Sequence, residues 1–565
     1  MTDRLLIRAD ASTRIGTGHV MRCIALAQRW QQAGGRAVFS QACSTPAADE
    51  RLRAEGFEVL PAGGEPGSPE DAAQTSAHAK TLGAAWVVAD GYAFGPQWQR
   101  QVSQSGSRLL VLDDYGHSES YHADLVLNQN AGAEDALYGR RDPATRLLLG
   151  SHYALLRREF APWRDLDRTF QANATKVLVT LGGSDPDNVT GKVVEALRGI
   201  PGIEAVVVVG GSNPHLEAIR SSLGKIPSSI RLSVNPSDMP ELMAWAEVAV
   251  SAAGSTSWEM AFMGLPAIFI VAADNQRKIA AALDAAHAGV NLGPHYSLTP
   301  DAIARALRAL LGDAPRRKAM SAGGRRLVDG RGSCRVLAAL GAALDITILS
   351  EAQSWLDPYL AELRELFEKA GHRVHAVGDP GDIPDGDIAF LFSPGQGVPA
   401  RVLRRNAHNL LVHESALPAG RGAAPLTWQL LEGKSEIPVC LAEAAEPIDS
   451  GPVYSRDLIR FEGHELIDEI RTARARATQW LCGGFVSRYP WISSEGRPQQ
   501  GEPTFYPERR PDDCRLDPRK TLAEQFNLLR VCDPDRDPAF FELEGHRFEV
   551  RIRAASRRDE ETSTP

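Results

Sequence analysis

The sequence predicts an α/β chain built around parallel sheets, and two observations carry that prediction. Short apolar segments alternate with amphipathic helical segments along most of the 565 residues, as they do in parallel sheets covered by helices. Glycine-bearing turns follow several of the apolar segments and open helices, and ligands bind at that edge of such sheets. A chain of this length is expected to form roughly three or four domains.

Composition excludes several classes of function. The net charge of −9 argues against a general nucleic-acid or membrane-surface role. Seven cysteines occur without a CxxC pair, so we expect neither a zinc site nor a redox pair, and an odd number suits a reducing compartment. No signal-peptide pattern and no apolar run long enough to span a bilayer is evident. We therefore expect a cytoplasmic protein with no metal, no membrane insertion and no nucleic-acid partner, and the oligomeric state stays open.

The first domain is expected over residues 1–157, where the alternation is clearest. Strands are predicted at residues 5–8, 37–40, 57–60, 86–89, 109–112 and 124–127, and helices at 20–32 and 47–54. The carboxyl ends of parallel strands meet at one edge of a sheet. We therefore expect the polar residues at the strand ends to gather there: His19, Asp90, Tyr92, Asp113, Asp114, Tyr115, Asn128 and Asn130.

The loop after the first strand is the clearest candidate for a ligand site. It reads Gly16-Thr17-Gly18-His19, with Arg22 one turn later. The two glycines let the backbone approach a ligand closely, and the N-terminus of the following helix favours an anion. A histidine in the same turn is suited to proton transfer near neutral pH.

A second α/β domain is expected over residues 158–342. Its predicted strands are residues 177–180, 205–209, 248–251 and 267–271. Two turns, Gly182-Gly183-Ser184 and Gly254-Ser255-Thr256, lead from strands into helices and suggest a nucleotide phosphate site. The alternative is that these glycines make plain tight turns and that Glu259 is a solvated helix residue.

Three stretches together resemble a known family. Residues 16–22, 181–188 and 254–259, the last with Asp274-Asn275-Gln276, are similar to the UDP-sugar hydrolases of the pseudaminic acid pathway (PseG type). Those enzymes are relatives of the MurG-type glycosyltransferases and share their two-domain GT-B fold. The resemblance covers about residues 3–340. It implies hydrolysis of UDP-2,4-diacetamido-2,4,6-trideoxy-β-L-altropyranose without a cofactor, in nonulosonic acid biosynthesis for surface glycans such as those of flagellin.

The resemblance also implies roles for individual residues. His19 is the general base of an inverting attack by water, Tyr92 is an active-site tyrosine, and Asn275 lies near the diphosphate. Glu259 matches the glutamate that binds the uridine ribose in the related transferases. The residues expected to bind substrate are Gly16, Gly18, Arg22, Asp90, Gly182, Gly183, Ser184, Gly254, Ser255, Thr256, Glu259, Asn275 and Gln276. Two rivals are a glycosyltransferase, and a nucleotide-sugar sensor or scaffold whose catalytic groups are incidental.

A fresh strand at residues 345–349 begins a third α/β domain, expected over 343–500. Strands are predicted at residues 373–377 and 388–392, and residues 393–397 form a glycine-bearing turn that suits a substrate or cofactor. His413 ends another apolar segment, and Asp449 lies in a later strand-turn. A single histidine at a strand end can also be purely structural.

The third domain resembles the 10-formyltetrahydrofolate-dependent formyltransferases of the methionyl-tRNA and amino-sugar types. The resemblance rests on His413, the turn 420–422, Asp449 and the segments 504–513 and 525–530. It implies formyl transfer from 10-formyltetrahydrofolate to an amino sugar, and a small β-rich domain over residues 501–556. The expected partners are therefore small molecules, a UDP-sugar and a folate.

One position departs from the formyltransferase pattern. In that family His413 would deprotonate the amine, Asp449 would support the imidazolium, and an asparagine two residues before the histidine would stabilise the oxyanion. Here that position is Leu411. Asn409 lies on the same face of the strand and is expected to substitute. The alternative is a third domain without catalytic activity.

Overall fold

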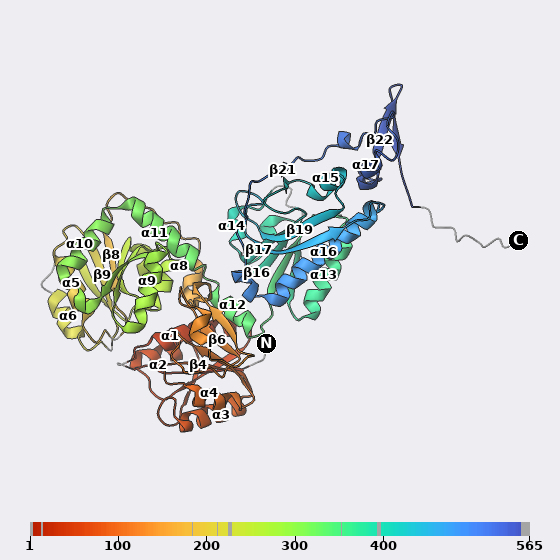
Figure 1. Ribbon diagram of the computed structural model, residues 1–565. Coiled ribbons are helices and arrows are strands. Elements are labelled where there is room, and N and C mark those ends of the chain that lie inside the picture. Colours follow the sequence, from red (N-terminus) through yellow and green to blue (C-terminus); the bar gives the residue numbers. More distant parts are fainter. Residues whose placement is uncertain are drawn as a thin grey trace. The chain divides into compact units, whose positions relative to one another are not determined.

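The computed structural model describes residues 4–12, 15–183, 185–211, 213–223, 229–351, 353–392 and 397–554. The chain divides into two compact units, residues 1–342 and 343–565. The first unit contains two parallel sheets, and the second contains one mixed sheet and two short two-stranded pairs, one parallel and one an antiparallel hairpin (Figure 1).

The first sheet of the first unit is parallel throughout, in the order β3-β2-β1-β4-β5-β6-β7. Its strands are β1 (Arg4–Ala9), β2 (Arg36–Gln41), β3 (Glu58–Pro61), β4 (Ala84–Asp90), β5 (Arg108–Leu112), β6 (Leu125–Asn128) and β7 (Arg146–Leu149). The helices are α1 (Gly18–Gln32), α2 (Pro46–Ala54), α3 (Pro69–Leu82) and α4 (Pro96–Ser103). Figure 1 shows α1 and α2 on one face of this sheet and α3 and α4 on the other. We call this part of the first unit the first lobe.

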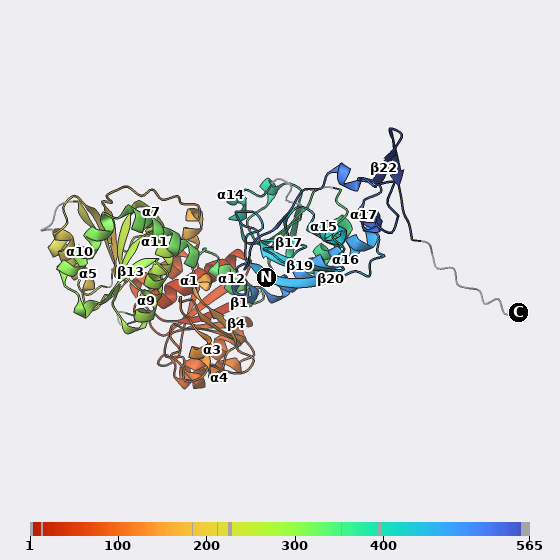
Figure 2. The same ribbon diagram turned by 45° about the horizontal axis from the view of Figure 1, so that its top comes forward.

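The second sheet of the first unit has the order β10-β9-β8-β11-β12-β13 and is also parallel. We call this sheet and its helices the second lobe. Its strands are β8 (Lys176–Thr180), β9 (Glu204–Val209), β10 (Ile230–Val234), β11 (Val248–Ala252), β12 (Ala267–Val271) and β13 (Gly289–Pro294). One apolar core lies under α5 (Val189–Arg198), α6 (Leu216–Leu223) and α10 (Pro300–Leu311). The opposite core lies under α7 (Met239–Trp245), α8 (Thr256–Phe262) and α9 (Arg277–Ala285). Figure 2 shows α5 and α10 on one side of this sheet and α7 and α9 on the other.

The end of the first unit returns to the first lobe. After α11 (Ala314–Leu327), the short helix α12 (Gly332–Ala339) packs against α1. The indole Nε1 of Trp86 donates to Leu340 O at 3.0 Å. This segment therefore ties the second lobe back onto the first.

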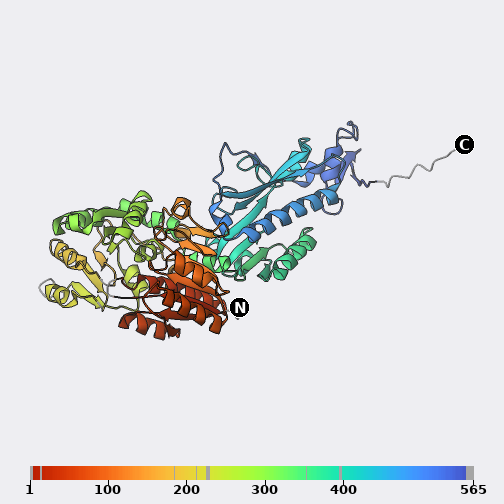
Figure 3. The same cartoon turned by 60° about the horizontal axis from the view of Figure 1, so that its bottom comes forward.

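The sheet of the second unit has the order β15-β14-β16-β17-β19-β20, and its last two strands are antiparallel to their neighbours. The strands are β14 (Asp345–Leu349), β15 (Arg373–Val377), β16 (Gly386–Leu391), β17 (Asn406–His413), β19 (Glu436–Glu443) and β20 (Val453–Arg460). The helices are α13 (Asp357–Lys369), α14 (Ala400–Leu403), α15 (Pro425–Leu431) and α16 (Ile467–Arg488). Figure 3 shows α13 and α16 side by side along one face of the sheet.

The chain beyond residue 500 adds a small separate core. Strand β21 (Phe505–Tyr506) pairs with β18 (Arg421–Gly422). The helix α17 (Phe526–Val531) and the hairpin of β22 (Ala539–Leu543) and β23 (His546–Val550) follow. Their apolar residues cluster with Cys514 and Leu516.

The predicted fold class, an α/β chain with Rossmann-like parallel sheets and sheet structure in its C-terminal part, is confirmed. In the first unit, the strands that the pattern did not predict, β7, β10 and β13, all lie at the edges of their sheets. In the second unit, the unpredicted strand β19 lies inside its sheet. An edge strand is covered less completely, so its apolar pattern is weaker. In β13 the segment Gly-Val-Asn-Leu-Gly-Pro is mostly half-buried.

Candidate functional site

His19 lies at the carboxyl edge of the first sheet as the second residue of α1. Its Nδ1 is 2.6 Å from Oδ1 of Asp90, the fully buried last residue of β4. An ionised carboxylate can only accept a hydrogen bond, so in the neutral ring Nδ1 carries the proton and Nε2 has the lone pair. Among the described residues no hydrogen bond to Nε2 is found. The His19 side chain is 11% exposed, so this nitrogen is a candidate base within a mostly buried loop.

Arg22 holds Asp90 in its ionised form. Its Nε and Nη2 donate to the two carboxylate oxygens of Asp90 at 2.6 and 2.7 Å, and its Nη1 donates to Asp114 at 2.7 Å. Burial alone would raise the pKa of Asp90, but the adjacent guanidinium of Arg22 and the His19 ring hold it well below its usual range. The same arginine keeps the pKa of Asp114 low against the effect of burial. A fully buried carboxylate, Asp90, and a partly buried one, Asp114, thus share one arginine.

Tyr92 connects this network to the second lobe. Its hydroxyl donates to Asp114 at 2.7 Å and accepts from Nδ2 of Asn275 at 3.0 Å. The ring stands edge-on to His19, with centroids 5.0 Å apart. Burial and the neighbouring Asp114 raise the pKa of Tyr92 far above its usual value. The phenol is therefore a permanent donor at neutral pH.

The glycine loops of the two lobes approach each other closely. A Cβ on Gly18 would lie 3.8 Å from Oγ of Ser255, and one on Gly183 would lie 3.2 Å from Oγ1 of Thr17. Gly16 has φ +77° and bridges to Ser12. The sequence-predicted loops around residues 16–19, 182–183, 254–256 and 275–276 therefore meet at one place.

The two glycine-bearing turns of the second lobe differ in whether their backbone amides already have hydrogen-bond acceptors. The side chain of Asp185 accepts from the amides of Val189 and Thr190 at 2.8 Å, and Asn188 accepts from Gly191. The N-terminus of α5 is thus occupied by its own chain. By contrast, the described residues offer no acceptor to the amides of residues 254–256. The second turn is the one whose amides are open to an anion.

The remaining predicted residues have defined surroundings. Glu259 accepts from Arg157 at 2.8 Å through Oε1. Gln276 accepts from the amide of Ala272 at 2.9 Å, and its Nε2 lies 3.8 Å from where a Cβ on Gly254 would stand. Gly182, with φ +96°, has open space around it. Ser184 lies outside the described residues.

Two further polar residues belong to the hydrogen-bond network of this site but were not among the site residues predicted from the sequence. The Asp114 carboxylate accepts hydrogen bonds from Arg22 and Tyr92, and Nδ2 of Asn130 donates to it at 3.0 Å. Both follow strands of the first sheet, so their place at the strand ends was the available signal. Arg157, which binds Glu259, follows no strand and had no such signal.

In the second unit, His413 and Asp449 are neighbours. Nδ1 of His413 lies 3.8 Å from Oδ1 of Asp449, and its Nε2 donates to Gly420 O at 2.9 Å. Asp449 has φ +60°, which is uncommon for a residue with a side chain, and accepts from the amide of Gly422 at 3.1 Å. Both side chains are over 90% buried. In the neutral ring, Nδ1 is therefore the free nitrogen.

Asn409 is not brought to this pair. It lies four strand residues from His413, roughly 13 Å along the strand. Its Nδ2 donates to Leu403 O at 2.7 Å, and its Oδ1 is buried without a hydrogen-bond partner. Leu411 packs in an apolar cluster with Leu417 and Cys440. Of the predicted turn 393–397, only Gly397 lies within the described residues.

The described residues contain no group of three or more His, Cys, Asp or Glu that could hold a metal ion. None of the helices described is both long and apolar enough to cross a membrane.

The chain was compared with known proteins. Residues 177–329 match the family model described as Glycosyltransferase family 28 C-terminal domain. The spore coat polysaccharide biosynthesis protein SpsG of Bacillus subtilis (strain 168) is 27% identical over 242 residues, 42% of this chain and 70% of that protein. A crystal structure of MurG from Acinetobacter baumannii aligns with a TM-score of 0.43 and 16% identity, covering 60% of this chain and 99% of that chain.

A second kind of relative matches as well. The methionyl-tRNA formyltransferase of Streptococcus gordonii is 30% identical over 153 residues, 26% of this chain and 48% of that protein. The chain thus spans about half the length of this curated relative. It carries a glycosyltransferase-28-like domain and a formyltransferase-like region.

Proposed function

We propose that the first unit hydrolyses UDP-2,4-diacetamido-2,4,6-trideoxy-β-L-altropyranose, or a close UDP-sugar, to UDP and the free sugar. The observation that carries this proposal is the His19–Asp90 pair. It leaves an unbonded imidazole nitrogen beside the loops where a nucleotide sugar would lie. The product would enter nonulosonic acid biosynthesis.

The chemistry follows from these groups. Nε2 of His19 removes a proton from water as the water oxygen bonds to the anomeric carbon. The bond from that carbon to the diphosphate breaks, and its electrons leave with UDP. Asp90 stabilises the imidazolium through Nδ1–H. The amides of residues 254–256 and the side chain of Asn275 stabilise the charge on the departing diphosphate. Attack opposite the leaving group inverts the anomeric configuration.

The other predicted residues would position the substrate. Glu259 would hold the uridine ribose through the oxygen that Arg157 does not bind. Tyr92, fixed by Asp114 and Asn275, would contact the sugar next to His19. We also propose that the chain has four domains, over residues 1–157, 158–342, 343–500 and 501–556.

The test is UDP release by the purified full chain from the UDP-sugar without an acceptor. Wild-type protein is expected to release UDP at an enzymic rate. His19→Gln is expected to lower kcat by about 10²–10⁴. His122→Gln, a histidine paired with exposed Asp142, serves as the control and should keep wild-type activity. Equal rates for His19→Gln and wild type would contradict the proposal.

A glycosyltransferase is the second candidate, and the match of residues 177–329 to the glycosyltransferase family 28 domain favours it. The same base would then deprotonate a sugar hydroxyl instead of water. UDP release that requires an added sugar acceptor would support this candidate and exclude hydrolysis.

For the second unit we propose N-formylation of an amino sugar. Bound 10-formyltetrahydrofolate would supply the formyl group. Beside His413 lies a buried apolar cluster of Leu411, Leu417, Cys440, Ala442 and Val453, against which the flat ring of a pterin would pack. Nδ1 of His413 would take the proton of the attacking amine, and Asp449 would stabilise the resulting imidazolium. Because Asn409 donates to Leu403 O, oxyanion stabilisation is not assigned to it.

Formyl transfer is tested with 10-formyltetrahydrofolate and nucleotide-linked amino sugars. The expected product is the N-formyl sugar, with loss of activity in His413→Gln. Absence of transfer to any such amine would leave the alternative of a second unit without catalytic activity.

A further inference from the structure

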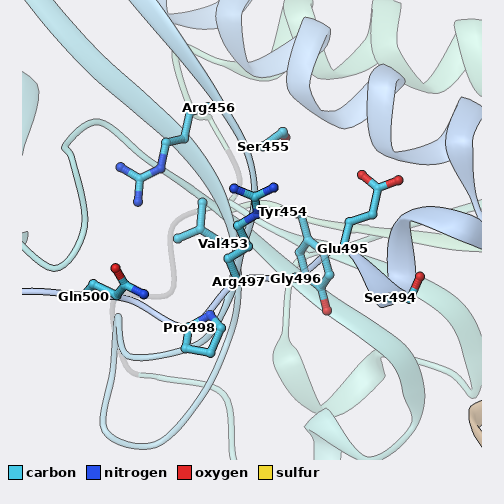
Figure 4. Close-up of a pocket in the computed structure, with 10 residues that line it drawn as sticks. All are labelled: Val453, Tyr454, Ser455, Arg456, Ser494, Glu495, Gly496, Arg497, Pro498 and Gln500. Carbon is cyan, nitrogen blue, oxygen red and sulfur yellow. The ribbon is translucent and has the colours of Figure 1, made fainter. Parts of the chain in front are cut away.

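A pocket of about 730 Å³ lies in the second unit between the start of β20 and residues 494–500. Figure 4 shows Arg456, Arg497 and Gln500 on its wall, with Val453 between the two arginines. Pockets of this volume hold small organic ligands. Nothing in the formyl-transfer chemistry described above uses these two arginines.

Several arginines of this unit have an acidic partner, unlike these two within the part of the chain that the structure describes. Arg373, Arg460, Arg476 and Arg515 each pair with a carboxylate within 3.0 Å. Within the described residues, neither Arg456 nor Arg497 has a carboxylate within 4.0 Å. Arg456 makes one side-chain hydrogen bond, to Leu417 O at 3.1 Å. Their charges are therefore free to bind a ligand.

Two acids close to the pocket in the fold are already engaged. Glu495 lines the pocket but pairs with Arg488. Glu443, on the neighbouring strand, accepts from the Tyr454 hydroxyl at 3.0 Å and lies 2.9 Å from Nδ1 of His408. Since neither carboxylate compensates the two guanidinium groups, the pocket has an excess of positive charge in a chain of net charge −9.

The register of the sheet places both arginines on the face that holds His413. Arg456 lies opposite Cys440, which lies opposite His413. The irregularity at Tyr454 brings Val453 opposite Ala442, on the same face. Arg497 exchanges both backbone hydrogen bonds with Val453, at 2.9 and 3.0 Å, and so shares that face. Gln499 links this segment to the loop of Asp449 through Asp449 O at 2.7 Å.

We propose that Arg456 and Arg497 form a binding site for a ligand group with two negative charges, beside the formyl-transfer residues. Guanidinium forks bind phosphate and carboxylate oxygens in pairs. The two sources of such a group are the diphosphate of a nucleotide-linked amine and the glutamate carboxylates of a folate. Only the identity of the ligand rests on the proposed function. The positive charge and the geometry of the pocket do not depend on it.

The test is calorimetric titration of the full-length protein with UDP, and separately with tetrahydrofolate carrying one or three glutamates. Arg456→Gln and Arg497→Gln are expected to weaken one class of ligand at least tenfold. Arg460→Gln, on the same strand but paired with Glu436, is the matched control and should bind like wild type. All three arginines are exposed, so the variants should fold, which circular dichroism checks.

The pattern of loss identifies the source of the anion. If UDP binding falls from two sites to one, the site binds a diphosphate, and the remaining site belongs to the first unit. If wild type has one UDP site and it is lost in the variants, the pocket is supported while the first-unit site fails. Weakening of the triglutamate form alone assigns the folate tail. Unchanged binding of every probe in both variants, or equal loss in Arg460→Gln, overturns the proposal.

Discussion

At the scale of single residues, the site of the first unit depends on which nitrogen of His19 carries the proton. Asp90 determines this because Arg22 keeps its carboxylate ionised despite complete burial. The nitrogen left with a lone pair in the neutral ring is therefore Nε2. An amide in place of this carboxylate would not impose the tautomer, because its nitrogen can donate a hydrogen bond to Nδ1.

Asp90→Asn tests this dependence. The substituted amide can donate to Nδ1 and stabilise the wrong tautomer, so kcat for UDP release is expected to fall by about 10²–10⁴ with a smaller change in KM. The control is Asp142→Asn, which alters another aspartate–histidine pair, with Nδ1 of His122 at 2.9 Å. Steady-state kinetics at neutral pH give the comparison. Unchanged kcat in Asp90→Asn would mean that the pair is only structural.

At the scale of elements, strand-to-helix turns bring the site residues together, and one of these turns has no room for a side chain. A Cβ on Gly210, which follows β9, would lie 2.1 Å from Gly183 O. The turn after β8 is thus held in place by the turn after β9. Gly183 in turn lies near Thr17 of the first lobe.

Gly210→Ala is expected to displace the turn at Gly183. The free energy of unfolding should fall by about 1–3 kcal/mol, and UDP should bind more weakly because the turn lies beside the proposed nucleotide site. Thermal unfolding and calorimetry measure the two effects. Gly312→Ala is the control, since its Cβ would meet only Arg308 O at 3.7 Å. Similar behaviour of both variants would refute the close packing of these turns.

The loop after β5 is held by one buried carboxylate. Asp113 accepts from the amides of Tyr115 and Gly116 at 2.9 and 3.0 Å and from the Tyr121 hydroxyl. Burial alone would raise its pKa, but the His117 side chain at 3.3 Å and these hydrogen bonds lower it to about 2. A carboxyl whose folded-state pKa is depressed stabilises the fold above its unfolded pKa of about 3.9.

Asp113→Asn is therefore expected to lower the free energy of unfolding by about 2–3 kcal/mol at neutral pH. The difference from wild type should shrink as the pH falls from about 4 to about 2, because the wild-type carboxyl then takes up its proton. Thermal midpoints of both proteins at pH 7 and pH 3 provide the measurement. A difference that stays constant over this range would show that ionisation of Asp113 contributes nothing.

At the scale of the whole molecule, the chain joins a glycosyltransferase-28-like unit to a formyltransferase-like unit, and each has its own proposed catalytic histidine, His19 or His413. The two chemistries need not depend on each other, because no residue is assigned to both. His19→Gln should lower kcat for UDP release by about 10²–10⁴ and leave formyl transfer unchanged, whereas His413→Gln should impair formyl transfer and leave UDP release unchanged. Parallel assays of each variant check this separation. Loss of both activities in either variant would show that the units are coupled.

The sequence predicted the architecture and the strand ends well because buried parallel strands are nearly continuous apolar runs. His19, Asp90 and Tyr92 follow such runs and do lie together. The partners of these residues were harder to predict. Arg157 follows no strand, and a strand pattern says which face Asn409 occupies but not that Leu403 O takes its amide. Hydrogen-bond partners come from the packing of distant segments, which periodicity does not encode.

The most direct test of the central claim is hydrolysis of the UDP-sugar in water enriched in oxygen-18, with the mass of the released UDP as the readout. If the water activated by His19 attacks the anomeric carbon, UDP leaves with its original oxygens and shows its ordinary mass. Heavy oxygen in the released UDP would place the attack at phosphorus and contradict this account. Failure to release UDP without a sugar acceptor would contradict it as well.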